Sequence, residues 1–108
     1  MVARMKLRVK QEAKRRFKEI LSEGKERFGA RVANRLYQTY RHSIKLLEQN
    51  PYMGQVEPAL LEEPECYRGL CIHEHYKLIY RIERNIIYVV DVWDTRREPR
   101  QLVEGLID

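Results

Sequence analysis

The sequence predicts a single α+β domain in which an antiparallel pair of helices packs against a small β-sheet. Three observations lead to this prediction. A short stretch of alternating apolar and polar residues lies near the N-terminus, two stretches with helical spacing of apolar residues follow, and three closely spaced β-like stretches come last. No internal repeat or linker divides the chain. We therefore expect residues 1–108 to form one domain with one modest core.

The first half of the chain predicts a strand and two helices. Residues 5–9 alternate between apolar and positively charged side chains, which indicates a short half-buried strand. From 11 to about 25, and again from 30 to 49, apolar residues recur every three or four positions, which is typical of amphipathic helices. Gly29 marks the break between them, and Asn50-Pro51 ends the second helix because the residue before a proline disfavours helical geometry. A short joint between two such helices predicts an antiparallel hairpin.

The second half predicts a surface loop and an antiparallel meander. Residues 51–65 contain three prolines, a glycine and several glutamates, so we expect an irregular loop anchored by Leu60-Leu61. Three strands follow, at 66–72, 76–82 and 86–93. The short connections 73–75 and 83–85 make them an antiparallel meander, which completes a four-stranded sheet with the N-terminal strand. The last strand is almost wholly apolar, as expected of a strand covered on both faces. In the tail, residues 102–107 are expected either to form a short helical turn or to stay mobile.

Charge and composition limit the function classes. The formal net charge is +5, and a basic surface attracts polyanions, which include both nucleic acid and an acidic protein partner. No apolar run is long enough to cross a membrane, and the N-terminus lacks the apolar core of a secretory signal, so we expect a cytoplasmic protein. The chain also lacks a glycine-rich phosphate loop, and we expect no cofactor.

The two cysteines predict neither a disulfide nor a metal site. On one extended strand Cys66 and Cys71 would lie roughly 16 Å apart, whereas a disulfide needs Cα atoms within about 7 Å. We therefore expect reduced thiols that pack in the core. With His73 and His75 they read C-x4-C-x-H-x-H, which is not the paired close spacing of structural zinc sites. An ordinary hairpin is the favoured interpretation, and no metal is predicted.

Basic and aromatic side chains gather in the predicted meander and at its exit. Five are candidates for gripping an RNA backbone and stabilising charge during phosphodiester cleavage: Arg68, Lys77, Arg81, Arg96 and Arg97. Three more are candidates for binding nucleic acid or another target: His75, Tyr76 and Tyr80. The alternative is a solvated sheet face whose cations pair with Glu83 and with the glutamates of the loop. Cysteine nucleophiles are not favoured, because neither has a convincing base beside it in the sequence.

The position of Arg68 depends on the register of the first hairpin. Strand alternation puts Lys77 and Arg81 on one face. If 73 and 74 alone form the turn, Arg68 lies opposite Ile79 and joins that face. If 73–75 form the turn, Arg68 lies opposite Tyr80 and points the other way. The sequence leaves both registers open.

Four segments, taken in order, resemble the RelE/ParE superfamily of bacterial toxins, which includes plasmid stabilisation proteins. KQEAKRRFKEIL is similar to the family's first helix, and LLEQNPYMGQ to its helix-ending asparagine-proline-x-x-glycine turn. YRGLCIHEHYKLIYRI is similar to its tyrosine-arginine strand pair, and VWDTRREP to the close of its last strand. The resemblance covers about residues 5–102. It implies the toxin of a type II toxin–antitoxin module, neutralised by a cognate antitoxin with an acidic binding segment.

The resemblance implies two alternative targets. RelE-like members cut mRNA in the ribosomal A site without a metal, using basic sheet residues and a C-terminal tyrosine or histidine, whereas ParE-like members inhibit DNA gyrase. Position by position, Arg68 stands for a strand lysine of the nuclease, Lys77 for an arginine, and Arg96 or Arg97 for the arginine that follows the last strand.

Several features depart from the nuclease pattern. Leu70 replaces its second lysine, and the stretch after Arg100 offers no tyrosine or histidine. The long hairpin and the NPYMG turn favour the ParE branch. A third possibility, a non-catalytic nucleic-acid-binding or regulatory module on the same fold, also remains.

Overall fold

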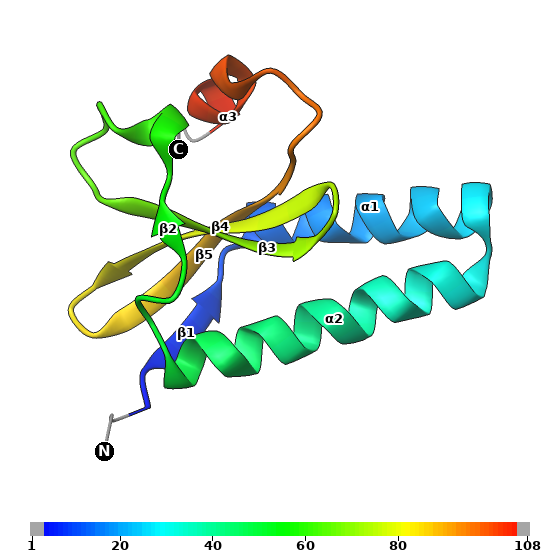
Figure 1. The fold of residues 1–108 in the computed structure, drawn as a ribbon, viewed down its shortest axis with the longest axis horizontal. Helices are drawn as coiled ribbons and strands as arrows, with labels where there is room; N and C mark the ends of the chain where they lie inside the picture. The colour runs from blue at the N-terminus through cyan, green and yellow to red at the C-terminus, as the bar shows by residue number, and fades with distance from the viewer. Residues whose placement is uncertain (1–3, 106–108) are drawn as a thin grey trace.

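The computed structural model describes residues 4–105 and has two layers, a helical hairpin and a mixed β-sheet (Figure 1). Along the chain the elements are β1 (Lys6–Val9), α1 (Gln11–Phe28), α2 (Ala30–Gln49), β2 (Gln55–Val56), the 3-10 turn η1 (Pro58–Leu60), β3 (Tyr67–His73), β4 (Tyr76–Glu83), β5 (Ile86–Asp94) and α3 (Pro99–Gly105). The α+β class and the helical hairpin are as the sequence predicted. Both helices lie over one side of the sheet and project beyond it at the end where they are joined.

The sheet has five strands in the order β1-β5-β4-β3-β2, so the four-stranded prediction was incomplete. The additional strand, β2, lies in the segment expected to be an irregular loop and pairs with β3 at Gly69 and Arg68. Two residues are too few to display the alternation that marks a strand in a sequence. β1 runs parallel to β5, whereas the other pairs are antiparallel, so the sheet is mixed.

The ends of the two long helices show why the chain turns where it does. α1 continues to Phe28, three residues beyond the expected end, and the N–H of Gly29 still donates to the carbonyl of Lys25. Gly29 has φ of 93°, a conformation that costs glycine little, and it lets α2 begin at the next residue. α2 ends where Asn50 donates from its backbone and its side chain to the carbonyl of Leu46, just before the proline.

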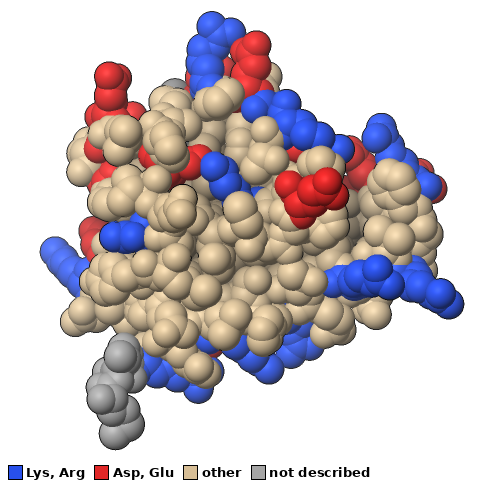
Figure 2. Space-filling view, in the orientation of Figure 1, with Lys and Arg blue, Asp and Glu red and all other residues tan. Residues whose placement is uncertain are grey.

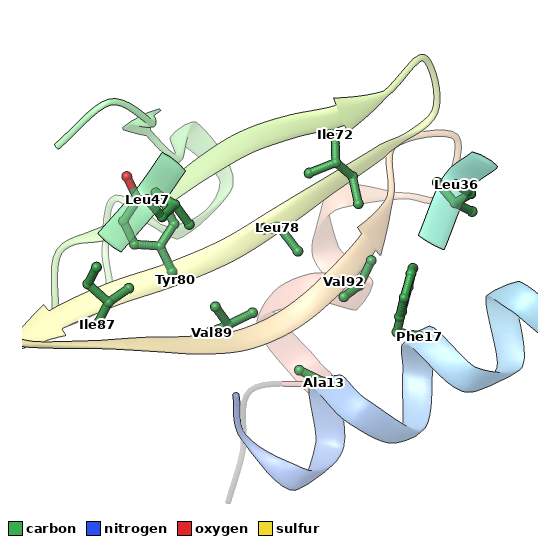
Figure 3. Packing of buried hydrophobic residues seen from close by; sticks show 10 residues of the cluster. All are labelled: Ala13, Phe17, Leu36, Leu47, Ile72, Leu78, Tyr80, Ile87, Val89 and Val92. Atoms are coloured by element: carbon green, nitrogen blue, oxygen red, sulfur yellow. The ribbon is translucent and has the colours of Figure 1, made fainter. Parts of the chain in front are cut away.

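Two apolar clusters cover the two faces of the sheet. The larger lies between the sheet and the helices and includes Phe17, Leu47, Leu78, Val89 and Val92 (Figure 3). The smaller lies on the other face, where η1 and α3 cover the sheet. It consists of Leu60, Tyr67, Ile79, Trp93 and Leu102. β4 and β5 contribute to both clusters, which explains the nearly continuous apolar sequence of β5.

The 51–65 segment and the tail are more ordered than a surface loop and a mobile end. Leu60 anchors the segment at 2% exposure, but Leu61, which we expected to share that role, is 68% exposed. α3 begins at Pro99, three residues before the predicted turn, and buries Leu102 completely. The last part of the predicted 102–107 turn lies outside the described residues.

A β-bulge decides the register that the sequence left open. The turn of the first hairpin consists of two residues, 74 and 75, and His73 pairs with Tyr76. An irregularity between Cys71 and His73 then shifts the pairing by one residue, so that Arg68 lies opposite Tyr80. The side chains of Arg68 and Tyr80 therefore lie on the helix-covered face. Lys77 and Arg81 lie on the other face.

The cysteines are free, as expected, but they are not core residues. Cys66 precedes β3, Cys71 lies within it, and both are exposed. The burial prediction was wrong because Cys71 pairs with Lys77 and therefore lies on the face of the sheet away from the helical hairpin. Among residues 4–105, no helix is both long and apolar enough to cross a membrane.

Candidate functional site

Residues 50–54 (NPYMG) form a turn that hydrogen bonds attach to the β-sheet. The hydroxyl of Tyr80, which is completely buried, donates to the carbonyl of Pro51 at 2.8 Å and accepts from the N–H of Gly54 at 2.9 Å. Arg68 donates to the carbonyl of Gly54 at 2.8 Å. Burial raises the pKa of the Tyr80 hydroxyl, against the opposing effects of the Gly54 N–H and of Arg68. Tyr80 therefore holds this turn from inside the protein.

The turn displays apolar side chains beside Arg68. Tyr52 is 63% exposed, and the guanidinium of Arg68 lies 5.3 Å from the centre of its ring. Met53 and Val56, which follow along the turn and β2, are also exposed. Arg68 is thus occupied on two sides, by a backbone carbonyl and by an aromatic ring.

Lys77 is held in a largely buried ion pair with Glu57. Its ammonium group contacts both carboxylate oxygens of Glu57, and the distance to Oε2 is 2.8 Å. The side chain of Glu57 is 4% exposed and that of Lys77 is 21% exposed. The pair ties the segment between β2 and η1 to the first part of β4, and the carboxylate of Glu57 neutralises the charge of Lys77. Glu57 was not singled out by the sequence analysis, because one glutamate in an acidic loop carries no distinguishing signal.

Arg81 lies on the same face as Lys77, in mixed electrostatic surroundings. Its guanidinium stacks 4.7 Å from the ring centre of Tyr88 and pairs with Glu83. Arg81 also lines a hollow of about 870 Å³ between the start of α1, the 63–65 segment and the end of α3. Four carboxylates line this hollow as well, those of Glu12, Glu63, Glu65 and Glu104. The hollow therefore has no excess of positive charge to attract a phosphate.

The last two of the five candidate cations, Arg96 and Arg97, follow the end of β5 and have different neighbours. Arg96 pairs with Asp94 and lies 5.8 Å from the ring centre of Tyr76, with a 3.4 Å contact to its hydroxyl. The hydrogen bond from Arg96 holds the pKa of the Asp94 carboxyl below its usual value. Arg97 lies over the ring of Trp93 at 4.8 Å and donates to Gln101. Trp93 is on the face of Lys77, so the two neighbouring arginines engage opposite faces.

The five candidate catalytic cations do not form one cluster. Arg68 and Arg96 lie on the helix-covered face, at opposite ends of the stretch of β4 from Tyr76 to Tyr80. Lys77, Arg81 and Arg97 engage the other face. Of the three residues predicted to bind a target, Tyr80 is buried, and only His75 and Tyr76 lie together, at the turn between β3 and β4, with His73 beside them. Their roles in catalysis or binding remain predictions.

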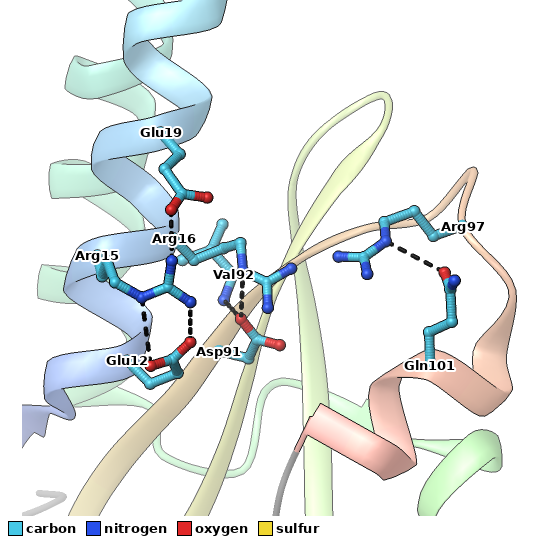
Figure 4. A network of polar contacts seen from close by, with 8 residues as sticks. All are labelled: Glu12, Arg15, Arg16, Glu19, Asp91, Val92, Arg97 and Gln101. Atoms are coloured by element: carbon cyan, nitrogen blue, oxygen red, sulfur yellow. Dashed lines mark hydrogen bonds and ion pairs between the residues drawn. The ribbon is translucent and has the colours of Figure 1, made fainter.

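A buried carboxylate between α1 and β5 is a polar centre that the sequence analysis did not identify. Asp91 is 4% exposed, accepts from the N–H of Val92, and lies 3.9 Å from Nε of Arg16 (Figure 4). Burial raises the pKa of the Asp91 carboxyl, although the charge of Arg16 acts in the opposite direction. The lone aspartate in the apolar run IIYVVDVW was the signal that could have revealed it. Within residues 4–105, no group of three or more His, Cys, Asp or Glu side chains could hold a metal ion.

Comparison with known proteins decides the family. The model of the ParE toxin of the type II toxin–antitoxin system parDE matches residues 7–99, which is most of the chain. The protein belongs to the ParE toxin family. This confirms the superfamily resemblance, and a ParE toxin of a toxin–antitoxin system implies an antitoxin as partner.

A solved structure supports the fold of this ParE family member. The chain is similar to one described as "Chromosomal ParDE TA system from P. aeruginosa", with a TM-score of 0.70 and 19% identity, over 85% of this chain and 97% of that chain. At this identity the similarity concerns the fold alone. The search of curated proteins gave no match.

Proposed function

We propose that this ParE family member is a cytoplasmic toxin that arrests growth by inhibiting DNA gyrase and that an antitoxin with an acidic binding segment neutralises it. The observation that carries the choice of target is the arrangement of the cations that a nuclease would need. They are divided between the two faces of the sheet, and Lys77 is neutralised by the buried carboxylate of Glu57. An enzyme that cleaves a phosphodiester must aim several positive groups at one phosphate.

The environment of Arg81 also favours a target other than an RNA backbone. Four glutamates line the hollow next to it. Carboxylates repel phosphates, so this part of the face that carries Lys77 and Arg81 is unfavourable for an RNA strand.

Two assays with the purified protein test the proposal side by side. One measures supercoiling of relaxed plasmid by gyrase, and the other measures cleavage of mRNA on programmed ribosomes. We expect the protein to inhibit supercoiling and to leave the mRNA intact, and addition of the protein encoded next to it should restore supercoiling. Ribosome-dependent mRNA cuts without an effect on gyrase would overturn the choice of target. No effect in either assay, with no growth arrest on expression, would overturn the toxin role.

One cluster favours mRNA cleavage as the second candidate. His73, His75 and Tyr76 lie at the same turn, with ring centres 6.4 Å apart for the histidines and 6.0 Å apart for His73 and Tyr76, and Arg96 stacks on Tyr76. Such groups can transfer protons and hold a phosphate. If cleavage occurs, His75→Ala and Arg96→Ala should abolish it, whereas Lys77→Ala should act only through stability.

A further inference from the structure

The outer face of α2 carries an uninterrupted stripe of positive charge. Between residues 27 and 47 the chain contains five lysines and arginines and no aspartate or glutamate. Four of the five lie on α2 and are exposed: Arg31, Arg35, Arg41 and Lys45. At 100° per residue their side chains fall on one side of the helix, opposite the buried Leu36 and Leu47. The stripe from Arg31 to Lys45 is about 21 Å long.

The charges of this α2 stripe are not offset by the rest of the protein. Among residues 4–105, none of its four cations takes part in an ion pair, and Arg41 alone of the four lies over an aromatic ring, that of Tyr37. α1 is different, because Arg15 bonds to Glu12 and Glu19 and further glutamates follow along that helix. Figure 2 shows the same contrast: lysines and arginines follow the lower border, where Figure 1 draws α2, and acidic side chains lie mainly over the upper half.

We propose that the α2 stripe binds the phosphate backbone of double-stranded DNA. The residues between its cations are exposed and polar, namely Asn34, Gln38 and His42. The centre of a protein–protein interface is usually depleted of charge, whereas protein–DNA interfaces are polar and strongly positive, as this stripe is. Single-stranded nucleic acid is bound through several stacking rings, whereas this stripe has Tyr37 at its border and His42 within it.

The shape of the hairpin favours duplex DNA over duplex RNA. Arg31 and Arg35 lie at the end where α1 and α2 project beyond the sheet, so this part of α2 can approach another molecule without obstruction (Figure 1). A helix fits the major groove of B-form DNA, which is about 12 Å wide, and not the deep, narrow major groove of RNA. This inference goes beyond inhibition of gyrase, because it concerns the toxin and DNA without the enzyme.

Two triple variants with the same net charge test the proposal. The stripe variant carries Arg31→Gln, Arg35→Gln and Lys45→Gln. The control carries Lys14→Gln, Lys18→Gln and Lys25→Gln, three exposed lysines of α1. Each lowers the formal net charge from +5 to +2, since three cations are removed. Glutamine keeps nearly the same helix propensity, and circular dichroism checks that both variants fold.

Fluorescence anisotropy with a labelled 20-base-pair DNA duplex is measured over a series of salt concentrations. The stripe variant should bind at least about 10-fold more weakly than the unmodified protein at low salt, and its log–log salt dependence should be shallower by roughly 2 to 3. The α1 control should differ far less from the unmodified protein, both in its affinity for the duplex and in the salt dependence of binding. Equal losses in the two variants, or none in either, would overturn the proposal, as would tighter binding to single-stranded DNA or to duplex RNA.

The same stripe variant separates the DNA-binding proposal from two others, binding of an acidic protein partner and inhibition of gyrase. Loss of antitoxin binding with DNA binding retained would overturn it in favour of an acidic protein partner. The anisotropy experiment contains no gyrase, so failure of the gyrase proposal leaves its result unaffected. If both proposals hold, the stripe variant should inhibit supercoiling less than the α1 control does.

Discussion

Gly54 is a residue at which one added carbon atom would disturb several contacts at once. A Cβ there would lie 2.7 Å from the Tyr80 hydroxyl and 2.8 Å from the carbonyl oxygen of Gly69. Neither neighbour can retreat easily, because the tyrosine is fully buried and the carbonyl belongs to β3. The glycine of the NPYMG turn is therefore required for close approach of the turn to the sheet.

Gly54→Ala should lower the free energy of unfolding by about 1–3 kcal/mol, the usual cost of overpacking. Urea denaturation measures this change. Gly24→Ala is the matched control, because nothing lies within 4 Å of a Cβ there and the residue is inside α1. It should raise stability by roughly 0.5–1 kcal/mol. Equal stability of Gly54→Ala and the unmodified protein would show that the turn is not fastened as described.

Lys77 allows a structural role to be separated from a catalytic one. Lys77→Met leaves the carboxylate of Glu57 buried without its partner, and it should cost about 3 kcal/mol of stability. The double variant Glu57→Gln/Lys77→Met removes both charges and should recover most of that loss. Denaturation of the three proteins gives the comparison. Wild-type stability of Lys77→Met, combined with loss of toxicity, would contradict the structural role and favour direct participation in chemistry.

At the scale of elements, Asp91 joins α1 to β5 through a carboxylate that burial makes costly to ionise. Its pKa is raised above the ordinary value of 3.8, so between these two values the folded protein holds a proton that the unfolded chain has released. The contribution of Asp91 to stability therefore increases as pH falls through the raised pKa, and it declines as pH rises. Asparagine resembles the protonated form and can still accept from the N–H of Val92.

Asp91→Asn should therefore be at least as stable as the unmodified protein at neutral pH, and its advantage should shrink as pH falls toward 4. Unfolding free energies of the two proteins across this range give the measurement. Asp94→Asn should show the opposite trend, because its pKa is lowered and the carboxylate stabilises the fold above that value. A stability difference for Asp91→Asn that does not depend on pH would mean that Arg16 fully offsets the cost of burial.

The elements differ in how far the sequence could predict them. α2 was predicted with its observed bounds, because Gly29 and Asn50-Pro51 mark both ends locally. α1 was expected to end at about Lys25, just after Gly24, but a single glycine is tolerated within a helix that packs well and α1 continues to Phe28. β2 could not be recognised, since it is a strand only because β3 offers it an edge. The bulge that places Arg68 opposite Tyr80 likewise depends on packing of the two strands and not on a local signal.

The same distinction applies to the candidate site. Residue types and spacing drew attention to the basic residues of the meander, but the structure divides these residues between the two faces of the sheet. The partners of these residues come from distant parts of the chain: Glu57 for Lys77 and Gly54 for Arg68. The same holds for the buried Asp91, whose partner Arg16 lies on α1. Register and tertiary contacts decide which cations are free to bind a ligand, so the sequence alone does not distinguish the unpaired cations of α2 from the paired cations elsewhere.

At the scale of the whole molecule, the sheet order places the most protected backbone at its centre. β4 lies between β3 and β5, β5 lies between β1 and β4, and both are covered by apolar clusters on their two faces. Leu78, Ile79, Val89 and Val92 are completely buried. β2, by contrast, is a two-residue edge strand whose Val56 is 43% exposed, and α3 is a single short helix on the far face.

Native-state hydrogen exchange should therefore reveal two classes of amide. Those of the central parts of β4 and β5 should exchange only through global unfolding, with free energies equal to that from denaturation. Those of Val56 and of α3 should exchange through local opening at lower free energy, and urea should change their exchange little. The measurement is by NMR on the isolated protein. Equal protection in β2 and β4 would contradict this order, because it would require the edge strand to open only together with the core.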